Sequence, residues 1–413
     1  MILLRDLLHT LPGAMTARWN RLTLRSAMRA TGILVQGACA ALLAFSAAAA
    51  PVPGTSCSVL PADNIWNTDI SDLPVHARSD AWLASMSAAT RNLHPDFGAF
   101  PYGLPFIVVD SRHALATIAF DYADESDPGP YPFDGNTPIE GGAGSGGDQH
   151  ALMIDKDTCV LFELYDANWN GGDPTAGSGA IFDLGANALR PDTWTSADAA
   201  GLPIFPGLVR FDEVQAGAIN HAIRVTASRT DRSYLWPARH QAGAANDSNL
   251  PPMGARFRLK ASYDISGFSA EAQAILTALK RYGFLLADNG SDWFFQGVQD
   301  ARWGDSLLDE LKSVPAAQFE AVDASSLIID PDSGAARVSG TGTGGGTGAE
   351  PGSGTGSDTE GGSGGAFSLF AGVVGLLLGF LRARQVSLFG RTKVPNPAIE
   401  SGPPLVAPAR VWL

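Results

Sequence analysis

Two histidines in matching contexts are the first residues whose type and spacing could support chemistry. His150 is the second residue of the run QHAL and His221 is the second residue of the run NHAI, so each follows a polar residue and precedes a strand-like stretch. A neutral imidazole at the start of a strand can act as a general base. If the two strands are neighbours, both imidazoles face one cleft. The alternative is that each is a half-buried structural histidine, the commoner role of a single histidine.

Carboxylates precede the first of these histidines. Glu140 and Asp148 flank a Gly-rich loop within the Pro-stiffened stretch 124–150, which we interpret as a cleft rim, with a solvated surface loop as the alternative. Glycoside hydrolysis needs one protonated and one ionised carboxyl group about 5–9.5 Å apart. The sequence offers further carboxylates for such a pair in Glu163, Asp183 and Asp288.

A second set of side chains around His221 is typical of polysaccharide lyases, which abstract a proton beside a uronate carboxylate. Asn220, Tyr234 and Arg239 could supply the neutralising and proton-transferring groups. We assign Trp236, Asn220 and Lys260 to substrate binding, because an exposed indole stacks on sugar rings. The alternative is an ordinary polar sheet face.

Motifs for other chemistries are missing from the sequence. There is no H-E-x-x-H, no Cys/His cluster and no G-x-S-x-G. We therefore predict no metal site and assign no cofactor.

The charge distribution argues against nucleic acid as a partner. The chain carries a net charge of −14, and because both ends are basic the stretch 51–365 carries about −22. Phosphate backbones require a basic surface. An extracellular polysaccharide or the cell envelope is the partner that we expect.

Both ends of the chain have the composition of targeting segments. Residues 1–50 contain a basic Arg29, an apolar run and four consecutive alanines before Pro51, which predicts a secretory signal peptide. Met28 is the start that we expect for it, with Met15 as the alternative. Residues 336–365 are a Gly/Ser/Thr-rich linker. The apolar stretch 366–381 is followed by Arg382 and Arg384, which predicts a short membrane-anchoring helix with its basic end in the cytoplasm.

The Gly-rich spacer, short apolar helix and basic cluster of residues 361–384 resemble the GlyGly-CTERM sorting tails of Gram-negative bacteria. The resemblance implies cutting by a rhomboid-like sorting protease, rhombosortase, and a place at the cell surface or in the medium. Such tails end after the basic cluster, whereas here a Pro-rich stretch of unknown role, 385–413, follows. If this stretch is part of the protein, plain membrane anchoring is the better interpretation.

Cysteine usage fits export. Cys39 lies in the leader, which leaves Cys57 and Cys159 to form a disulfide between the first strand and a central one. Two unpaired buried thiols are the alternative.

Residues 51–335 read as a single large domain, mainly β with a few helices, built as a β-sandwich or a curved antiparallel sheet. Ser269 and Gly283 delimit the strongest helix, a shorter one is expected over 305–312, and Asn289-Gly290 predicts a hairpin between 284–287 and 293–296. The other expected strands are 105–109, 116–122, 151–154, 160–165, 219–226, 234–236 and 256–260.

The stretches 201–214 and 259–291 resemble uncharacterised secreted bacterial proteins. This resemblance implies no particular reaction or mechanism. Export, acidity and a β scaffold with long loops lead us to expect a protein that acts on extracellular carbohydrate, as a hydrolase or lyase. The alternative is a non-catalytic adhesin or a cell-envelope or carbohydrate-binding protein.

Overall fold

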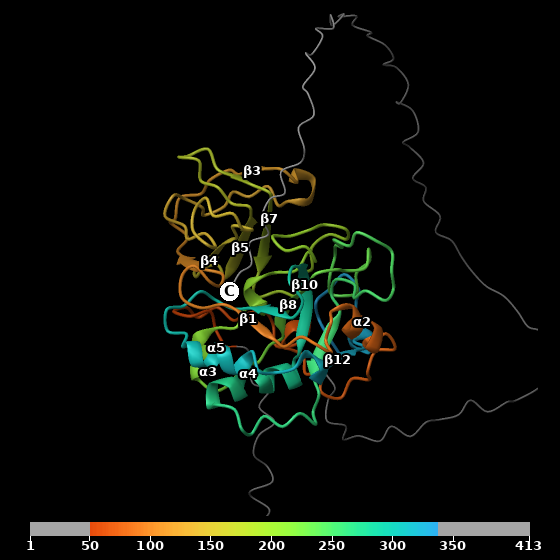
Figure 1. Ribbon diagram of the computed structural model, residues 1–413. Coiled ribbons are helices and arrows are strands. Elements are labelled where there is room, and N and C mark those ends of the chain that lie inside the picture. Colours follow the sequence, from red (N-terminus) through yellow and green to blue (C-terminus); the bar gives the residue numbers. More distant parts are fainter. Residues whose placement is uncertain (1–49, 338–413) are drawn as a thin grey trace, which may run out of the picture. The chain divides into compact units, whose positions relative to one another are not determined.

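Three β-sheets form the framework of residues 50–337, the part of the chain that the computed structural model describes (Figure 1). The largest sheet is mixed, with parallel pairs β1–β11 and β8–β10 and antiparallel pairs elsewhere. Its strands, in spatial order, are β1 (His94–Asp96), β11 (Phe294–Gln296), β8 (Ile223–Ala227), β10 (Phe284–Asn289), β9 (Arg256–Leu259) and β12 (Phe319–Val322).

A four-stranded sheet lies beside it, and successive side chains along its strands pack alternately into two separate hydrophobic cores. Leu152 and Leu161 face the main core, whereas Met153 and Leu164 face a smaller core covered by the loops around Tyr131. Its strands are β2 (Phe106–Val109), β4 (Ala151–Asp155), β5 (Val160–Tyr165) and β7 (Ser178–Asp183), and a two-stranded sheet pairs β3 (Ala119–Phe120) with β6 (Thr175–Ala176).

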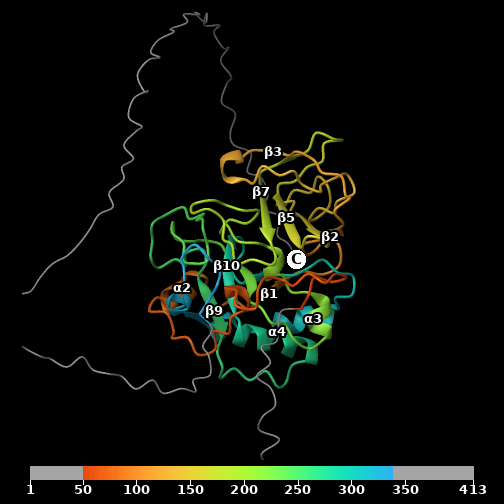
Figure 2. The same cartoon turned by 180° about the vertical axis from the view of Figure 1, so that it is seen from behind.

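Helices α3, α4 and α5 lie on the side of the six-stranded sheet away from the four-stranded sheet (Figures 1 and 2). The helices are α2 (Ser79–Ser85), α3 (Phe211–Gln215), α4 (Ala270–Arg281) and α5 (Asp305–Leu311), and the short 3-10 turns are η1 (Ile65–Asn67), η2 (Ala123–Glu125), η3 (Phe205–Gly207), η4 (Ala316–Gln318) and η5 (Ser325–Leu327).

Local sequence signals explain the longest helix. The hydroxyl of Ser269 accepts the backbone N–H of Ala272, which caps the first turn of α4 as predicted. Gly283 follows its last turn with a φ of +68°, where a Cβ would lie 2.1 Å from the carbonyl oxygen of Phe257. Only glycine fits this position.

The predicted fold class, a mainly β single domain with a few helices, is confirmed, although the sheets contain parallel as well as antiparallel pairs. The predicted hairpin is wrong, because β8 lies between β10 and β11 and pairs with both. Residues 234–236 form one bridge, Tyr234 with Met253, instead of a strand, and the stretch 116–122 contributes only β3.

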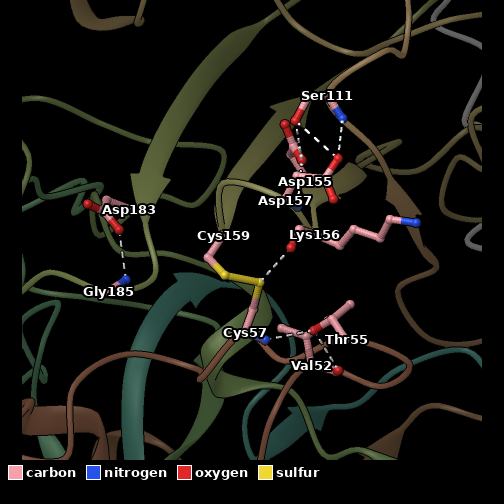
Figure 3. Close-up of a disulfide and its surroundings, with 10 residues drawn as sticks. All are labelled: Val52, Thr55, Cys57, Ser111, Asp155, Lys156, Asp157, Cys159, Asp183 and Gly185. Carbon is pink, nitrogen blue, oxygen red and sulfur yellow. Dashed lines mark hydrogen bonds between the residues drawn. A yellow bond between two sulfur atoms is a disulfide. The ribbon is translucent and has the colours of Figure 1, made fainter.

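The predicted disulfide between Cys57 and Cys159 is confirmed (Figure 3). Cys159 lies in the turn between β4 and β5, and Cys57 lies in the irregular segment that precedes η1 rather than in a strand. The bond therefore ties the start of the described chain to the four-stranded sheet.

The last described segment, 330–337, returns to the start of the domain. The N–H of Ile65 donates to the carbonyl of Gly334, and the N–H of Ala336 donates to that of Asp63. The indole of Trp236 donates to the carbonyl of Ser333, 2.8 Å away. Both ends of the described domain are thus hydrogen-bonded to each other.

The signal peptide, most of the linker, the apolar stretch 366–381 and the tail 385–413 lie outside the described residues. Within residues 50–337, no helix combines the length and apolar character that crossing a bilayer requires.

Candidate functional site

A pocket of about 460 Å³ opens where the ends of the two larger sheets meet. β5 and β7 contribute Tyr165 and Ser178 from one sheet, and the end of β10 contributes Asp288 and Asn289 from the other. The remaining lining comes from loops: Tyr122, Glu125, Asp148, Thr195, Ser196, Ala197, Asp198, Ala199, His240 and Ala242.

Asp288 reaches this pocket because of a β-bulge. The register of β10 against β8 pairs Leu286 with Val225 but Asp288 with Thr226, so Ala287 is the extra residue. Paired residues share a sheet face, and a regular strand would have turned Asp288 to the opposite face from Arg224. The bulge instead brings Oδ2 of Asp288 to 3.6 Å from Nη2 of Arg224.

Arg224 is a buried cation that holds two carboxylates. Its side chain is 1% exposed, and its Nη2 donates to Oδ2 of Asp198 at 3.2 Å. Its Nη1 donates to the side-chain oxygen of Gln296 on β11. Oδ2 of Asp198 and Oδ2 of Asp288 both lie within 3.6 Å of this Nη2 atom, so the two carboxyl groups are close neighbours.

The two aspartates differ in what else they bind. Asp198 is fully buried, and its Oδ1 accepts the N–H groups of Ala200 at 2.8 Å and Leu202 at 3.3 Å. Asp288 keeps 21% of its side-chain surface exposed and accepts the N–H of Asn289 at 2.7 Å. Burial raises the pKa of both carboxyls, against the opposing effect of Arg224. The carboxyl oxygens of Asp198 are therefore bound within the protein, whereas the carboxyl of Asp288 is accessible from the pocket and has a raised pKa.

His150 and Glu140 form an ion pair behind the pocket. Nδ1 of His150 donates to Oε2 of Glu140 at 2.6 Å, and its Nε2 donates to the carbonyl of Ala197 at 3.0 Å. Burial alone would lower the pKa of His150, but the Glu140 carboxylate outweighs it and raises that pKa to about 9. The imidazole is charged, and both of its nitrogens are used, so it fixes the loop at Ala197 instead of offering a free base.

Two more acids lie around Arg224 without lining the pocket. Glu163 on β5 is fully buried and accepts the N–H groups of Ile204 and Phe205, and burial raises its pKa to about 7. Burial and the nearby Glu140 raise the pKa of Asp96 to about 6. In both carboxyls the charge of Arg224 lowers the pKa, against the larger effect of burial.

The accessible side of the pocket carries Asp148, Glu125 and His240. Asp148 is exposed. Oε2 of Glu125 accepts the N–H of Thr195 at 3.1 Å and lies 3.9 Å from Nε2 of His240, whose Nδ1 donates to the carbonyl of Ala199. Tyr122 stands at the rim with 55% of its surface exposed.

Of the six residues predicted to be catalytic, Asp148 lines the pocket and His150 and Glu140 lie directly behind it. Tyr234 and Arg239 lie elsewhere: Tyr234 donates to Asp192, and Arg239 binds Asp332 and the carbonyl of Pro331. Trp236, predicted to bind substrate, holds the same returning segment. Trp236 and Arg239 therefore anchor the end of the described chain, whereas Tyr234 is bound to the loop at Asp192.

His221 belongs to another buried cluster. Its Nε2 lies 3.1 Å from Oε2 of Glu213, which is also paired with Arg210, and its Nδ1 donates to the carbonyl of Ala222. It precedes β8 of the six-stranded sheet, whereas His150 precedes β4 of the other, so the two strands are not neighbours, and neither histidine lines the pocket. Asn220 does not line the pocket, and Lys260 donates to the carbonyl of Ala317.

The sequence interpretation missed Asp198 and Arg224. A signal for Arg224 exists, since an arginine interrupts the apolar run Ala222–Ala227 where each side chain is buried. Asp198 has no comparable signal in its loop. Asp288 was one of several carboxylates considered for an acid pair.

In residues 50–337, no group of three or more His, Cys, Asp or Glu side chains is arranged to hold a metal ion. Comparison with family models, with curated proteins and with solved structures found no match to this chain.

Proposed function

We propose that the domain is an exported glycoside hydrolase that cleaves extracellular carbohydrate at the pocket between its sheets. The observation that carries the proposal is Asp288, an accessible carboxyl with a raised pKa that faces a pocket also lined by the exposed Asp148. Two carboxyls in different environments are the equipment of glycosidases, in which the buried one acts as the acid.

In this mechanism Asp288 donates its proton to the glycosidic oxygen as the bond from that oxygen to the anomeric carbon breaks. Water adds to the anomeric carbon, and Asp148 accepts the proton that this water releases. Arg224, 3.6 Å from Asp288, stabilises the carboxylate that proton donation leaves behind. Tyr122 at the rim offers an exposed ring for stacking on a sugar.

The hydrolase is favoured over the lyase because the residues of the lyase set have separate partners. His221 is bound to Glu213, whereas Tyr234 is bound to Asp192 and Arg239 to Asp332. None of the three lines the pocket.

The test is a screen of the purified protein against polysaccharides and peptidoglycan, with two readouts. Hydrolysis releases reducing ends without ultraviolet absorbance, and Asp288→Asn abolishes it. Absorbance of unsaturated uronates would instead indicate a lyase. Retention on an insoluble polymer without turnover would indicate the non-catalytic binding protein.

Export and surface location are part of the proposal and rest on the sequence of the two ends. The signal peptide of residues 1–50 directs the chain outward, and residues 361–384 direct anchoring or cutting by a rhomboid-like protease. Fractionation of cells that express the full chain tests this. Deletion of 361–384 is expected to move the protein from the membrane fraction to the soluble exported fraction, and an unchanged distribution would contradict the assignment.

A further inference from the structure

The charged groups that a ligand would meet in the pocket are almost all acidic. Asp288, Glu125 and Asp148 have side chains accessible from it, with exposures of 21% for Asp288 and 35% for Glu125. Among the described residues that line it there is no lysine or arginine. The entrance therefore presents carboxyl groups, of which Glu125 and Asp148 carry the negative charge while Asp288 holds its proton.

The cationic side chains near the pocket are buried and cannot contact a ligand. Arg224 is 1% exposed and bound to Asp198, and His150 is 2% exposed and bound to Glu140. His150 is paired with Glu140, and Arg224 is shared between Asp198 and Asp288, so neither cation is paired with Glu125 or Asp148. His240 lines the pocket, but its Nδ1 is bound to a backbone carbonyl and its Nε2 faces Glu125.

The surroundings of Tyr165, which lies in the wall of the pocket, are also negatively charged. Burial raises the pKa of its phenol, and the charges of Asp148, Asp166 and Asp288 raise it further. An anionic substrate such as a uronate would meet repulsion here, whereas an ammonium group would be attracted.

We propose that the substrate of this pocket is a polymer of amino sugars with free amino groups, and that Glu125 binds the ammonium group. The inference rests on the proposed hydrolase function and adds its substrate class. Glu125 suits this role because the N–H of Thr195 fixes Oε2, and because it lies apart from the Asp288–Arg224 contact that the chemistry uses. The exposed ring of Tyr122, which lines the same pocket, can add a cation–π contact.

The experiment compares three β-1,4-linked oligosaccharides of equal length that differ in one substituent: glucosamine, N-acetylglucosamine and glucose. Calorimetric affinity is measured with the Asp288→Asn protein, and kcat/KM is measured with the wild type. We expect the glucosamine oligomer to exceed the acetylated one by about tenfold in both quantities, equivalent to about 1.4 kcal/mol. The preference should shrink in high salt, since it is electrostatic.

The variant Glu125→Gln keeps the shape of the side chain and removes its charge. It is expected to abolish most of the preference for the glucosamine oligomer, whereas the control Glu271→Gln on α4 leaves it unchanged. An equal or greater preference for the acetylated or the glucose oligomer would overturn the proposal, as would a preference that Glu125→Gln does not alter.

The two proposals fail separately. If glucosamine oligomers bind in a Glu125-dependent way but nothing is cleaved, the hydrolase proposal is wrong and the amino-sugar site stands. If the protein cleaves only neutral or acidic polymers in an Asp288-dependent way, the hydrolase stands and the amino-sugar inference is wrong.

Discussion

Asp288 lies 3.6 Å from the buried guanidinium of Arg224 because the bulge at Ala287 turns the end of β10 by one residue. Without that extra residue the carboxyl would point to the helical side of the sheet. β-Bulges often re-aim a side chain next to a functional site. Here the bulge also leaves Asp288 at the mouth of the pocket, where burial raises the pKa of its carboxyl while 21% of its side-chain surface stays exposed.

Substitution of this carboxyl is expected to remove the activity and preserve the fold. Asp288→Asn keeps the shape of the side chain but cannot donate a carboxylic proton, so kcat should fall by about 10²–10⁴. Reducing-end assays give the rate, and circular dichroism checks the fold. The exposed Asp72, which does not line the pocket, provides the control Asp72→Asn with wild-type activity. A fully active Asp288→Asn protein would contradict the assignment.

Stability is expected to fall as the pH rises through the titration of His150. The folded protein holds this proton with a pKa of about 9 against 6.5 in the unfolded chain. The ion pair with Glu140 therefore contributes fully below about pH 6.5 and is lost towards pH 9, a change of roughly 3 kcal/mol. Urea unfolding between about pH 7.5 and 9.5 measures about 2 kcal/mol of this change, and Glu163 and Asp96 contribute little there because they titrate lower, at about 7 and 6.

The matched comparison for this pH effect is His150→Gln, which cannot titrate. It should be less stable than the wild type at neutral pH by about 2–3 kcal/mol, because Glu140, which is 23% exposed, loses its charged partner. Its stability should change little across the same pH interval. A decline as steep as that of the wild type would mean that another group is responsible.

His221→Ala is expected to affect stability and spare turnover. Removal of the imidazole leaves Glu213 with Arg210 alone in a buried site, which should lower the unfolding free energy by about 2–4 kcal/mol. Below the melting temperature kcat should stay within about twofold of the wild type. Thermal denaturation and kinetics of one preparation test both statements, with the partly exposed His113→Ala as control. A folded but inactive His221→Ala protein would restore the catalytic role that the sequence suggested.

Reduction of the disulfide is expected to destabilise the domain strongly. Cys57 and Cys159 are 102 residues apart, and closing a loop of this length stabilises the folded state by about 4.7 kcal/mol in the chain-entropy model. The wild type should melt at a lower temperature in reductant. The double variant Cys57→Ser/Cys159→Ser should melt low in both conditions, and a reductant effect that persists in it would place the cause elsewhere.

The elements that the sequence predicted well depend on local signals. β5 matches the expected stretch 160–165, and α4 follows the cap signals of Ser269 and Gly283. The hairpin failed because Asn289-Gly290 is a local turn signal, whereas the insertion of β8 between β10 and β11 is a long-range event.

The same difference between local and long-range signals decides which residues of the candidate site could be predicted. Asp148 and Glu140 could be selected from their Pro- and Gly-rich surroundings, and His150 from its place before a strand. The Arg224–Asp198 pair joins residues 26 positions apart in different elements, so no local pattern announces it. Nor could spacing show that Trp236 and Arg239 bind the segment 330–337 rather than the pocket.

The hydrogen bonds between Ile65 and Gly334 and between Asp63 and Ala336 leave the beginning and the end of the described domain side by side. Such a domain suits circular permutation, because a short connection can join its old ends while new ends are opened in an exposed loop. The exposed, Gly-containing turn at 171–173 is one such place. A permuted protein cut there would retain both sheets and the disulfide, and its pocket could be studied free of the two segments that flank it in the natural chain.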